Sequence, residues 1–169
     1  MVEILWILVL DKVLGLPYNL SWRKVRYMCA KTQSLSSGLE DYLEEIYIAH
    51  LNETPLKGAE LARKLNISRA SVSEALSKLV SKDLIKYNSY EAISLTRKGL
   101  EDAQRVYAKH HILKDFFEEV LEISADEASE NACKIEHIIS QNVLDRMINF
   151  TDFYKKNRET IEKLKKENS

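Results

Sequence analysis

The chain has 169 residues, of which 45% are hydrophobic and 30% charged, and its 4 glycines and 2 prolines favour long helices over a many-stranded β fold. Its formal net charge of -1 means that any affinity for DNA has to come from a local basic face rather than from the overall charge. Two well-separated cysteines, Cys29 and Cys133, make no disulfide framework, and we expect a reducing, cytoplasmic setting.

Residues 1–37 form an N-terminal extension. Its apolar run, residues 4–10, is far shorter than the roughly 20 residues of a transmembrane helix, and it lacks the basic start of a secretory signal. We therefore expect no membrane association. A polar stretch begins at Met28, which we predict to be the natural start; the alternative is that residues 1–27 form a helix packed on the domain.

Residues 38–98 have the pattern of a winged helix-turn-helix. Apolar spacing predicts a helix over residues 39–51, a short helix over residues 56–65 and a third helix that Ser68 caps. Alternating residues then predict two strands, residues 84–87 and 92–95, joined by a turn at residues 88–89. Two short helices with a tight turn, followed by a hairpin, are the elements of this DNA-binding fold.

From Thr96 onward the pattern is helical. One long helix reaches about residue 120, a capping-box pattern at residues 124–127 begins another, and Ser140 is placed to cap a third. Residues 151–169 are rich in Lys and Glu and predict a solvated or frayed helix. The fold class is therefore mainly α: a winged helix-turn-helix domain, then an all-helical domain over residues 99–150.

The third helix carries candidate DNA contacts off its apolar stripe. Small and basic side chains in its first turns suit the major groove, and the wing supplies candidate phosphate contacts. The helix candidates are Ser68, Arg69, Ala70, Ser71, Ser73, Glu74 and Lys78, and the wing candidates are Lys86, Asn88 and Ser89. A carboxylate such as Glu74 is unusual there; it could accept from a cytosine amino group or be merely solvated. Many similar folds bind protein instead of DNA, so the pattern alone leaves both partners open.

Three groups of candidate metal ligands accompany this domain. Asp41 and Glu44 are three residues apart on the first helix, two histidines lie at 110 and 111, and a thiolate, a carboxylate and an imidazole follow on one predicted helix at Cys133, Glu136 and His137. Mixed O, N and S donors suit a divalent transition metal better than calcium or magnesium. Taken alone, each group could also consist of ordinary polar residues on the solvent-exposed face of a helix.

Taken together, these stretches resemble the diphtheria toxin repressor family of iron- and manganese-dependent regulators. The resemblance covers residues 39–150, and its matching segments are residues 39–47, 60–73, 95–99 and 133–137, in matching order and spacing. It implies a homodimer whose winged helix-turn-helix domains bind a palindromic operator in double-stranded DNA when metal is present, and a helical domain for metal binding and dimerisation.

By position, the resemblance implies six metal ligands: Asp41, Glu44, His110, Cys133, Glu136 and His137. Asp41 is the residue type of the manganese-responsive branch, whereas Cys133 is the type of the iron-responsive branch. We therefore expect Mn(II) or Fe(II), with Zn(II) or Co(II) as alternatives. At the ancillary site of the iron branch, Lys114 and Ser129 replace the usual ligands, and the chain ends before the third domain of that branch.

Two alternatives come from other classes. The first is a winged-helix regulator that does not depend on metal, whose DNA binding would survive a chelator. The second is a metalloenzyme, which we do not expect because the sequence offers no spare general base or nucleophile beside the candidate ligands.

Overall fold

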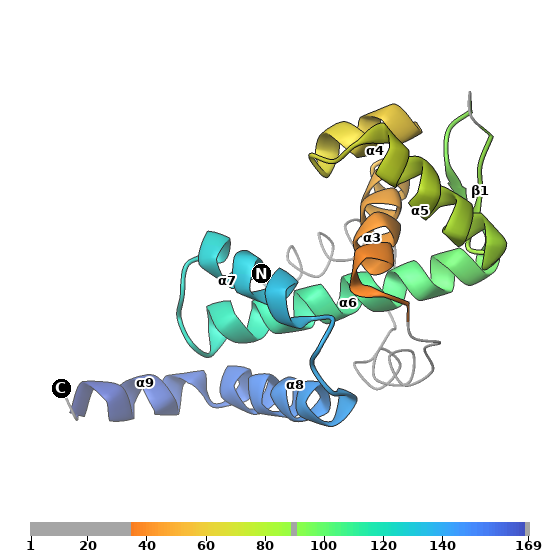
Figure 1. Cartoon of the computed structure of the whole chain (residues 1–169). Helices are drawn as coiled ribbons and strands as arrows, with labels where there is room; N and C mark the ends of the chain where they lie inside the picture. Colours follow the sequence, from red (N-terminus) through yellow and green to blue (C-terminus); the bar gives the residue numbers. More distant parts are fainter. Residues whose placement is uncertain (1–34, 89–90, 168–169) are drawn as a thin grey trace. The chain divides into compact units, whose positions relative to one another are not determined.

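The computed structural model describes residues 35–88 and 91–167 (Figure 1). The predictions about residues 1–34, including the start at Met28, and about Ser89 therefore lie outside the described residues. Two compact units divide after Tyr107, and each is described by itself below. The domain boundary predicted after residue 98 is a different division and stays a prediction.

Three helices form the centre of the first unit, as predicted. They are α3 (Ser37–Leu51), α4 (Gly58–Lys64) and α5 (Arg69–Ser81). The turn between α4 and α5 places Asn66 at a φ of 53°, a left-handed conformation that asparagine tolerates. Ser68 then caps α5, because its Oγ accepts a hydrogen bond from the Ser71 backbone N–H at 3.0 Å.

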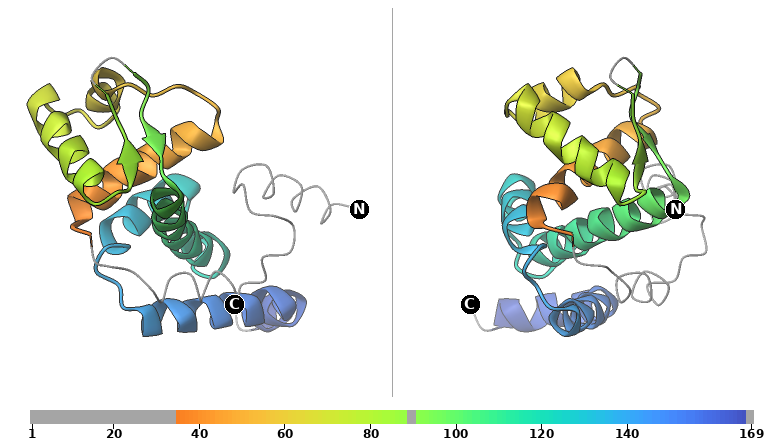
Figure 2. Two further views of the ribbon diagram at one scale, coloured as in Figure 1. Left: turned by 90° about the vertical axis from the view of Figure 1, so that its right-hand side faces the viewer. Right: turned by 45° about the vertical axis from the view of Figure 1, so that its right-hand side comes forward.

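The predicted wing is a short antiparallel hairpin of β1 (Ile85–Lys86) and β2 (Ser94–Leu95), in which Ile85 pairs with Leu95. Both strands are shorter than predicted. The reason lies partly at Ile93, whose N–H donates to the Leu56 carbonyl at 2.8 Å and so pairs with the chain before α4 instead of with β1. β1 contacts α5, and β2 contacts α3 (Figure 2).

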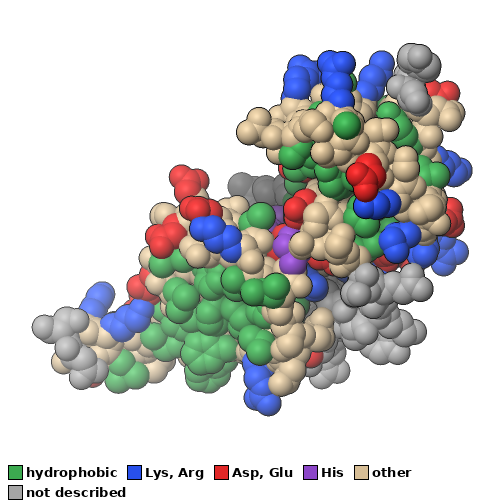
Figure 3. Space-filling model, viewed as in Figure 1, with side chains coloured by type: hydrophobic (Ala, Val, Ile, Leu, Met, Phe, Trp, Pro, Cys, Tyr) green, Lys and Arg blue, Asp and Glu red, His purple; other side chains and the backbone are tan. Residues whose placement is uncertain are grey.

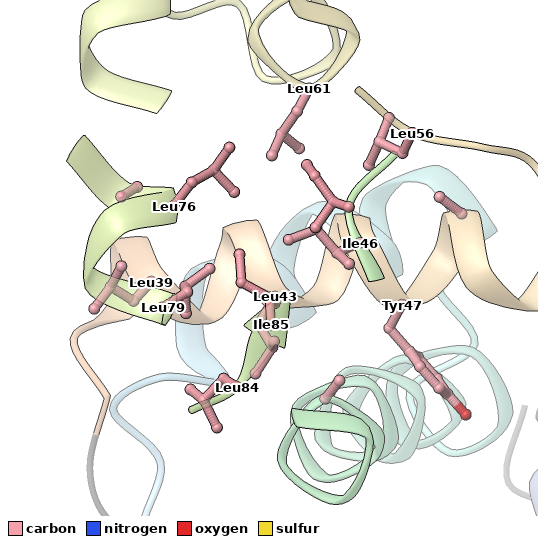
Figure 4. Packing of buried hydrophobic residues seen from close by; sticks show 14 of the residues in the cluster. Leu39, Leu43, Ile46, Tyr47, Leu56, Leu61, Leu76, Leu79, Leu84 and Ile85 are labelled. Atoms are coloured by element: carbon pink, nitrogen blue, oxygen red, sulfur yellow. The ribbon is translucent and has the colours of Figure 1, made fainter. Parts of the chain in front are cut away.

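One hydrophobic core holds the first unit together (Figure 4). Apolar side chains of α3, α4 and α5 meet there with those of the wing, and burying each large side chain contributes about 1.5–3 kcal/mol relative to exposure. Tyr47 stacks edge-on against Tyr107 with ring centroids 5.3 Å apart. The large, fully buried aliphatic members are Leu43, Ile46, Leu61, Val72, Leu76, Leu79 and Leu84.

A tight joint connects the wing to α6 (Arg97–Glu119). Thr96 begins this helix, because its Oγ1 accepts from the Gly99 N–H at 2.9 Å and donates to the Asp83 carbonyl at 2.7 Å. A Cβ on Gly99 would lie 1.7 Å from the Leu84 carbonyl oxygen, so only glycine permits this approach.

The second unit contains the end of α6 and three further helices: α7 (Ala125–Ile135), α8 (Gln141–Lys156) and α9 (Arg158–Glu167). As predicted, the hydroxyls of Ser124 and Ser140 cap α7 and α8. None of the helices in the described part of the chain is long and apolar enough to cross a membrane.

The predicted solvated helix corresponds to α9, which has no buried residue, whereas the first part of the tail belongs to α8 and packs into the second unit. α8 continues past residue 151, and Tyr154 is buried, with its hydroxyl donating to Glu122 Oε1 at 2.9 Å. Lys165 of α9 donates to the same carboxylate. These contacts tie the charged tail to the rest of the second unit.

Candidate metal centre and DNA-binding face

A buried carboxylate between two imidazoles marks the centre of the second unit. Glu136 is fully buried, and its Oε2 lies 2.7 Å from His110 Nδ1. Its Oε1 lies 3.4 Å from His137 Nε2. The structure thus brings together three of the predicted ligands from two separate segments of the chain.

The end of α7 places these groups. The prediction that one helix carries Cys133, Glu136 and His137 is wrong, because α7 ends at Ile135. Glu136 is its C-cap residue, and His137 lies in the turn that follows. The Lys109 ammonium donates to the Glu136 carbonyl at 3.4 Å, which binds the open helix end to α6.

Ser129 is a neighbour of this centre that the sequence did not point to. Its hydroxyl lies 3.3 Å from His110 Nε2, on the other side of the ring from Glu136. The sequence comparison placed Ser129 only at an altered ancillary site. Ser129 lies on the same face of α7 as Cys133, one turn earlier, and its contact with His110 depends on the packing of α7 against α6.

The donor set fits a divalent transition metal. Within the described residues, Glu136 Oε1 is a buried atom that has no hydrogen-bond partner, although a buried carboxylate oxygen usually has one. A carboxylate and two imidazoles are donors that manganese, iron and zinc share. The centre therefore offers a negative, shielded position for a cation.

The other three predicted ligands lie on α7 and on α3. Cys133 lies on α7, one turn before Glu136, and is exposed. Asp41 and Glu44 lie in the first unit, both on α3 and both half-buried, three residues apart as the sequence predicted.

Glu44 belongs to a polar group around two buried tyrosines of the first unit. Burial raises the pKa of Tyr107, and the nearby Tyr47 and the Glu44 carboxylate raise it further. Burial also raises the pKa of Tyr47, against a lowering hydrogen bond with Gln104. Both phenols therefore stay protonated and can act as hydrogen-bond donors near Glu44 at neutral pH.

The outer face of α5 presents the predicted DNA-contacting residues to solvent. Arg69, Ala70 and Ser73 are exposed, and the hydroxyls of Ser68 and Ser71 lie 2.8 Å apart. Glu74 and Lys78, which were also predicted, form an ion pair on this face. Small side chains on such a face let the backbone approach the groove closely.

Basic side chains surround this face. Lys and Arg residues project from the first unit over α4 (Figure 3), where Arg63 and Lys64 are exposed. On the wing, Lys86 is exposed, and the Asn88 side chain donates to Glu91 at 3.1 Å. Lys98, at the start of α6, donates to the Lys82 carbonyl at 2.9 Å.

Thr96 and Gly99 form a joint that the sequence pattern did not predict. A hydroxyl residue directly after a predicted strand and before a helical pattern is a helix-start signal that could have identified Thr96. No comparable signal exists for Gly99, because its constraint comes from the Leu84 backbone, which lies elsewhere in the sequence.

Two family profiles match the chain. Residues 34–93 match one described as iron dependent repressor, N-terminal DNA binding domain. Residues 96–165 match one described as iron dependent repressor, metal binding and dimerisation domain.

Individual proteins are also similar to the chain over most of its length. An HTH-type transcriptional regulator of Methanocaldococcus jannaschii is 39% identical over 122 residues, covering 72% of this chain and 98% of the relative. The HTH-type transcriptional regulator MntR of Geobacillus kaustophilus is 27% identical over 127 residues, covering 75% of this chain and 89% of the relative.

Among solved structures, the manganese regulator SloR matches with a TM-score of 0.60 and 31% identity over 68% of this chain. IdeR of T. acidophilum matches with a TM-score of 0.60 and 26% identity over 70% of this chain. The matches cover 54% and 55% of those two chains, so this chain spans about half their length.

Proposed function

The chain belongs to the iron-dependent repressor family, whose namesake is the diphtheria toxin repressor, and from this membership we propose that it is a metal-dependent, DNA-binding transcriptional repressor. It controls manganese or iron homeostasis, and the divalent metal acts as its co-repressor. The observation that carries the proposal is the buried Glu136 carboxylate between His110 and His137.

The proposed ligand set contains this centre and three further residues. His110, Glu136 and His137 are supported by their mutual distances of 2.7 and 3.4 Å across the carboxylate. Asp41, Glu44 and Cys133 are included on the family resemblance. Bound Mn(II) or Fe(II) supplies a positive charge that neutralises these donors, with Zn(II) or Co(II) as alternatives.

Metal can act on DNA affinity in one way only. It must bind more tightly to the DNA-competent arrangement of the protein than to the others, since equal affinity for all of them shifts nothing. The protein's own contribution is to hold the donors in place: Glu136 orients His110 through Nδ1, and Ser129 contacts the other nitrogen of that ring.

The first unit supplies the DNA-binding half of the proposal. The exposed face of α5, together with its N-cap residue, enters the major groove. The residues concerned are Ser68, Arg69, Ala70, Ser71, Ser73, Glu74 and Lys78. Lys86 and the wing residues Asn88 and Ser89 approach phosphates. The operator is a palindrome, read by two copies of the chain with recognition helices about 34 Å apart.

A homodimer is supported by an apolar face on the second unit. Hydrophobic side chains gather over the C-terminal part of α6 and over α8 (Figure 3). Exposed apolar patches of this kind mark protein-binding surfaces. The large exposed hydrophobic residues of this unit are Leu121, Ile138, Val143, Phe150, Phe153 and Leu164.

A DNA-shift titration tests the proposal. Duplexes are first selected from a random pool with the manganese-loaded protein, and binding is then measured anaerobically with Mn(II), Fe(II), Zn(II), Co(II) or a chelator. We expect binding with Mn(II) or Fe(II) and its loss in chelator. Unchanged binding in chelator would establish the metal-independent regulator instead, and metal uptake without any DNA selection would point to a metalloenzyme.

A matched pair of variants locates the effect. Glu136→Gln removes the buried charge and should abolish the metal response. Glu130→Gln changes an exposed carboxylate on α7, 69% accessible and paired with Lys134, and should leave the response intact.

A further inference from the structure

The outward face of α5 has few charged groups. Its exposed residues are serine, alanine and one valine, apart from Arg69, Glu74 and Lys78. The serines also engage the helix itself: Ser77 Oγ donates to the Ser73 carbonyl at 2.8 Å. Glu74 and Lys78 are therefore the long polar side chains that project from the middle of this helix.

These two residues form one unit. Lys78 Nζ lies 2.7 Å from Glu74 Oε1, and the side chains are 57% and 71% exposed. The hydrogen bond and charge of Lys78 lower the pKa of the Glu74 carboxyl, so Glu74 is ionised at neutral pH. An ionised carboxylate only accepts hydrogen bonds, and an ammonium only donates them.

The major groove restricts what such a unit can bind. A carboxylate is repelled by guanine and thymine edges, which present acceptors, and it finds donors only at the amino groups of cytosine and adenine. In an A·T pair the adenine amino group lies between two separate acceptors, adenine N7 and thymine O4. In a C·G pair the cytosine amino group lies beside the two adjacent acceptors of guanine, O6 and N7, which are the acceptors that lysine binds most often.

The partner of cytosine completes the match. A C·G pair places the cytosine N4 donor beside the guanine O6 and N7 acceptors in the same groove. Glu74 Oε2 can accept from the first while the remaining N–H groups of Lys78 donate to the second. The Glu74 carboxylate and the Lys78 ammonium thus place an acceptor beside a donor, and this base-pair edge offers a donor beside acceptors.

We propose that Glu74 and Lys78 act together as a specificity determinant that recognises one C·G base pair in each half-site of the operator. This inference rests on the proposed DNA-binding function and names part of the sequence that it selects. Lys78 also neutralises the carboxylate, which phosphates would otherwise repel.

Selection of random duplexes with manganese-loaded protein tests the inference. Wild type should select an invariant C·G pair at one half-site position, and replacing it by T·A should weaken binding about tenfold, the weight of one good base contact. Glu74→Ala should lose that preference and keep the others. Glu74→Gln should select A·T there, because glutamine bonds adenine N6 and N7 together.

Two further variants separate base recognition from helix stability. Lys78→Ala should relax the same position as Glu74→Ala. Glu130→Ala breaks a pair of the same i, i+4 spacing, also 2.7 Å, on α7, and should change no base preference. A Glu74→Ala variant that selects the wild-type sequence at every position overturns the inference and leaves the proposed function standing. If wild type selects no sequence at all, the proposed function fails and the inference with it.

Discussion

Gly99→Ala should strongly destabilise the first unit. The added Cβ would lie 1.7 Å from the Leu84 carbonyl oxygen and 2.7 Å from the Leu84 carbonyl carbon. Favourable contacts between carbon atoms lie at about 3.5–4.0 Å, so the overlap is severe. The atoms it meets are backbone atoms, which cannot rotate away as a side chain would. The start of the wing and the first turn of α6 must therefore move apart.

The size of the effect follows from what this movement disrupts. The Thr96 N–H donates to the Leu84 carbonyl at 3.0 Å, and the loss of such a bond costs about 1 kcal/mol. The Thr96 cap of α6 contributes about 1 kcal/mol more. Overpacking itself costs about 1–3 kcal/mol. We expect the free energy of unfolding to fall by about 3–5 kcal/mol, measured by urea denaturation followed by circular dichroism.

Gly38→Ala is the matched control. Gly38 is the second residue of α3, and a side chain there would meet no other described part of the chain within 4 Å outside its own helix backbone and chain neighbours. Alanine in that position should stabilise the protein by about 0.4–1 kcal/mol, chiefly because it restricts the unfolded chain. The two substitutions should thus have opposite signs. A Gly99→Ala variant that unfolds at the same urea concentration as wild type would falsify the close approach of α6 to the wing.

Three other predictions concern the second unit. Glu136→Gln should weaken Mn(II) binding at least tenfold in calorimetry, because an amide cannot supply the buried negative charge. Burial raises the pKa of Asp115 despite Lys155, 3.5 Å away, so the folded state binds its proton more tightly than the unfolded state. Wild type should therefore gain stability relative to Asp115→Asn as pH falls from 7 to 4 in urea titrations. Tyr154→Phe should lose about 1 kcal/mol and speed amide exchange in α9, because Glu122 loses its phenol donor.

Each of these has a control and a contrary result. For Mn(II) binding the control is Glu130→Gln; equal affinities of the two variants would remove Glu136 from the ligand set. For the pH effect, a stability difference between wild type and Asp115→Asn that is constant over the range would contradict the raised pKa. Exchange in α3, on the first unit, should not change in Tyr154→Phe, and a uniform change throughout the chain would mean general destabilisation.

Helices were predictable where local signals agree with apolar spacing. The hydroxyl caps at Ser68, Ser124 and Ser140 were all identified, and each lies directly before the helix it was expected to begin. Capping depends on bonds within a few residues, so the sequence contains the whole cause. The same holds for the three-residue spacing of Asp41 and Glu44 on α3.

Other features depend on contacts between distant segments, which no local pattern encodes. Spacing could not show that Ser129 lies against His110, nor that Ile93 pairs with the chain before α4. The end of α7 was missed because Glu136 and His137 continue the helical spacing of Cys133. Similarly, Lys and Glu in the tail indicated solvation, whereas a buried Tyr154 holds that segment through Glu122.

The helix end at Ile135 places a fully buried carboxylate beside two imidazoles. An isolated buried charge costs several kcal/mol unless its partners offset that cost. At the C-cap, Glu136 gains His110 and His137 for its two oxygens, while Lys109 binds its carbonyl. The compensation is incomplete, because one oxygen has no hydrogen bond within the described residues. An unsatisfied buried oxygen of this kind destabilises the metal-free protein, and a cation bound beside it would offset that cost.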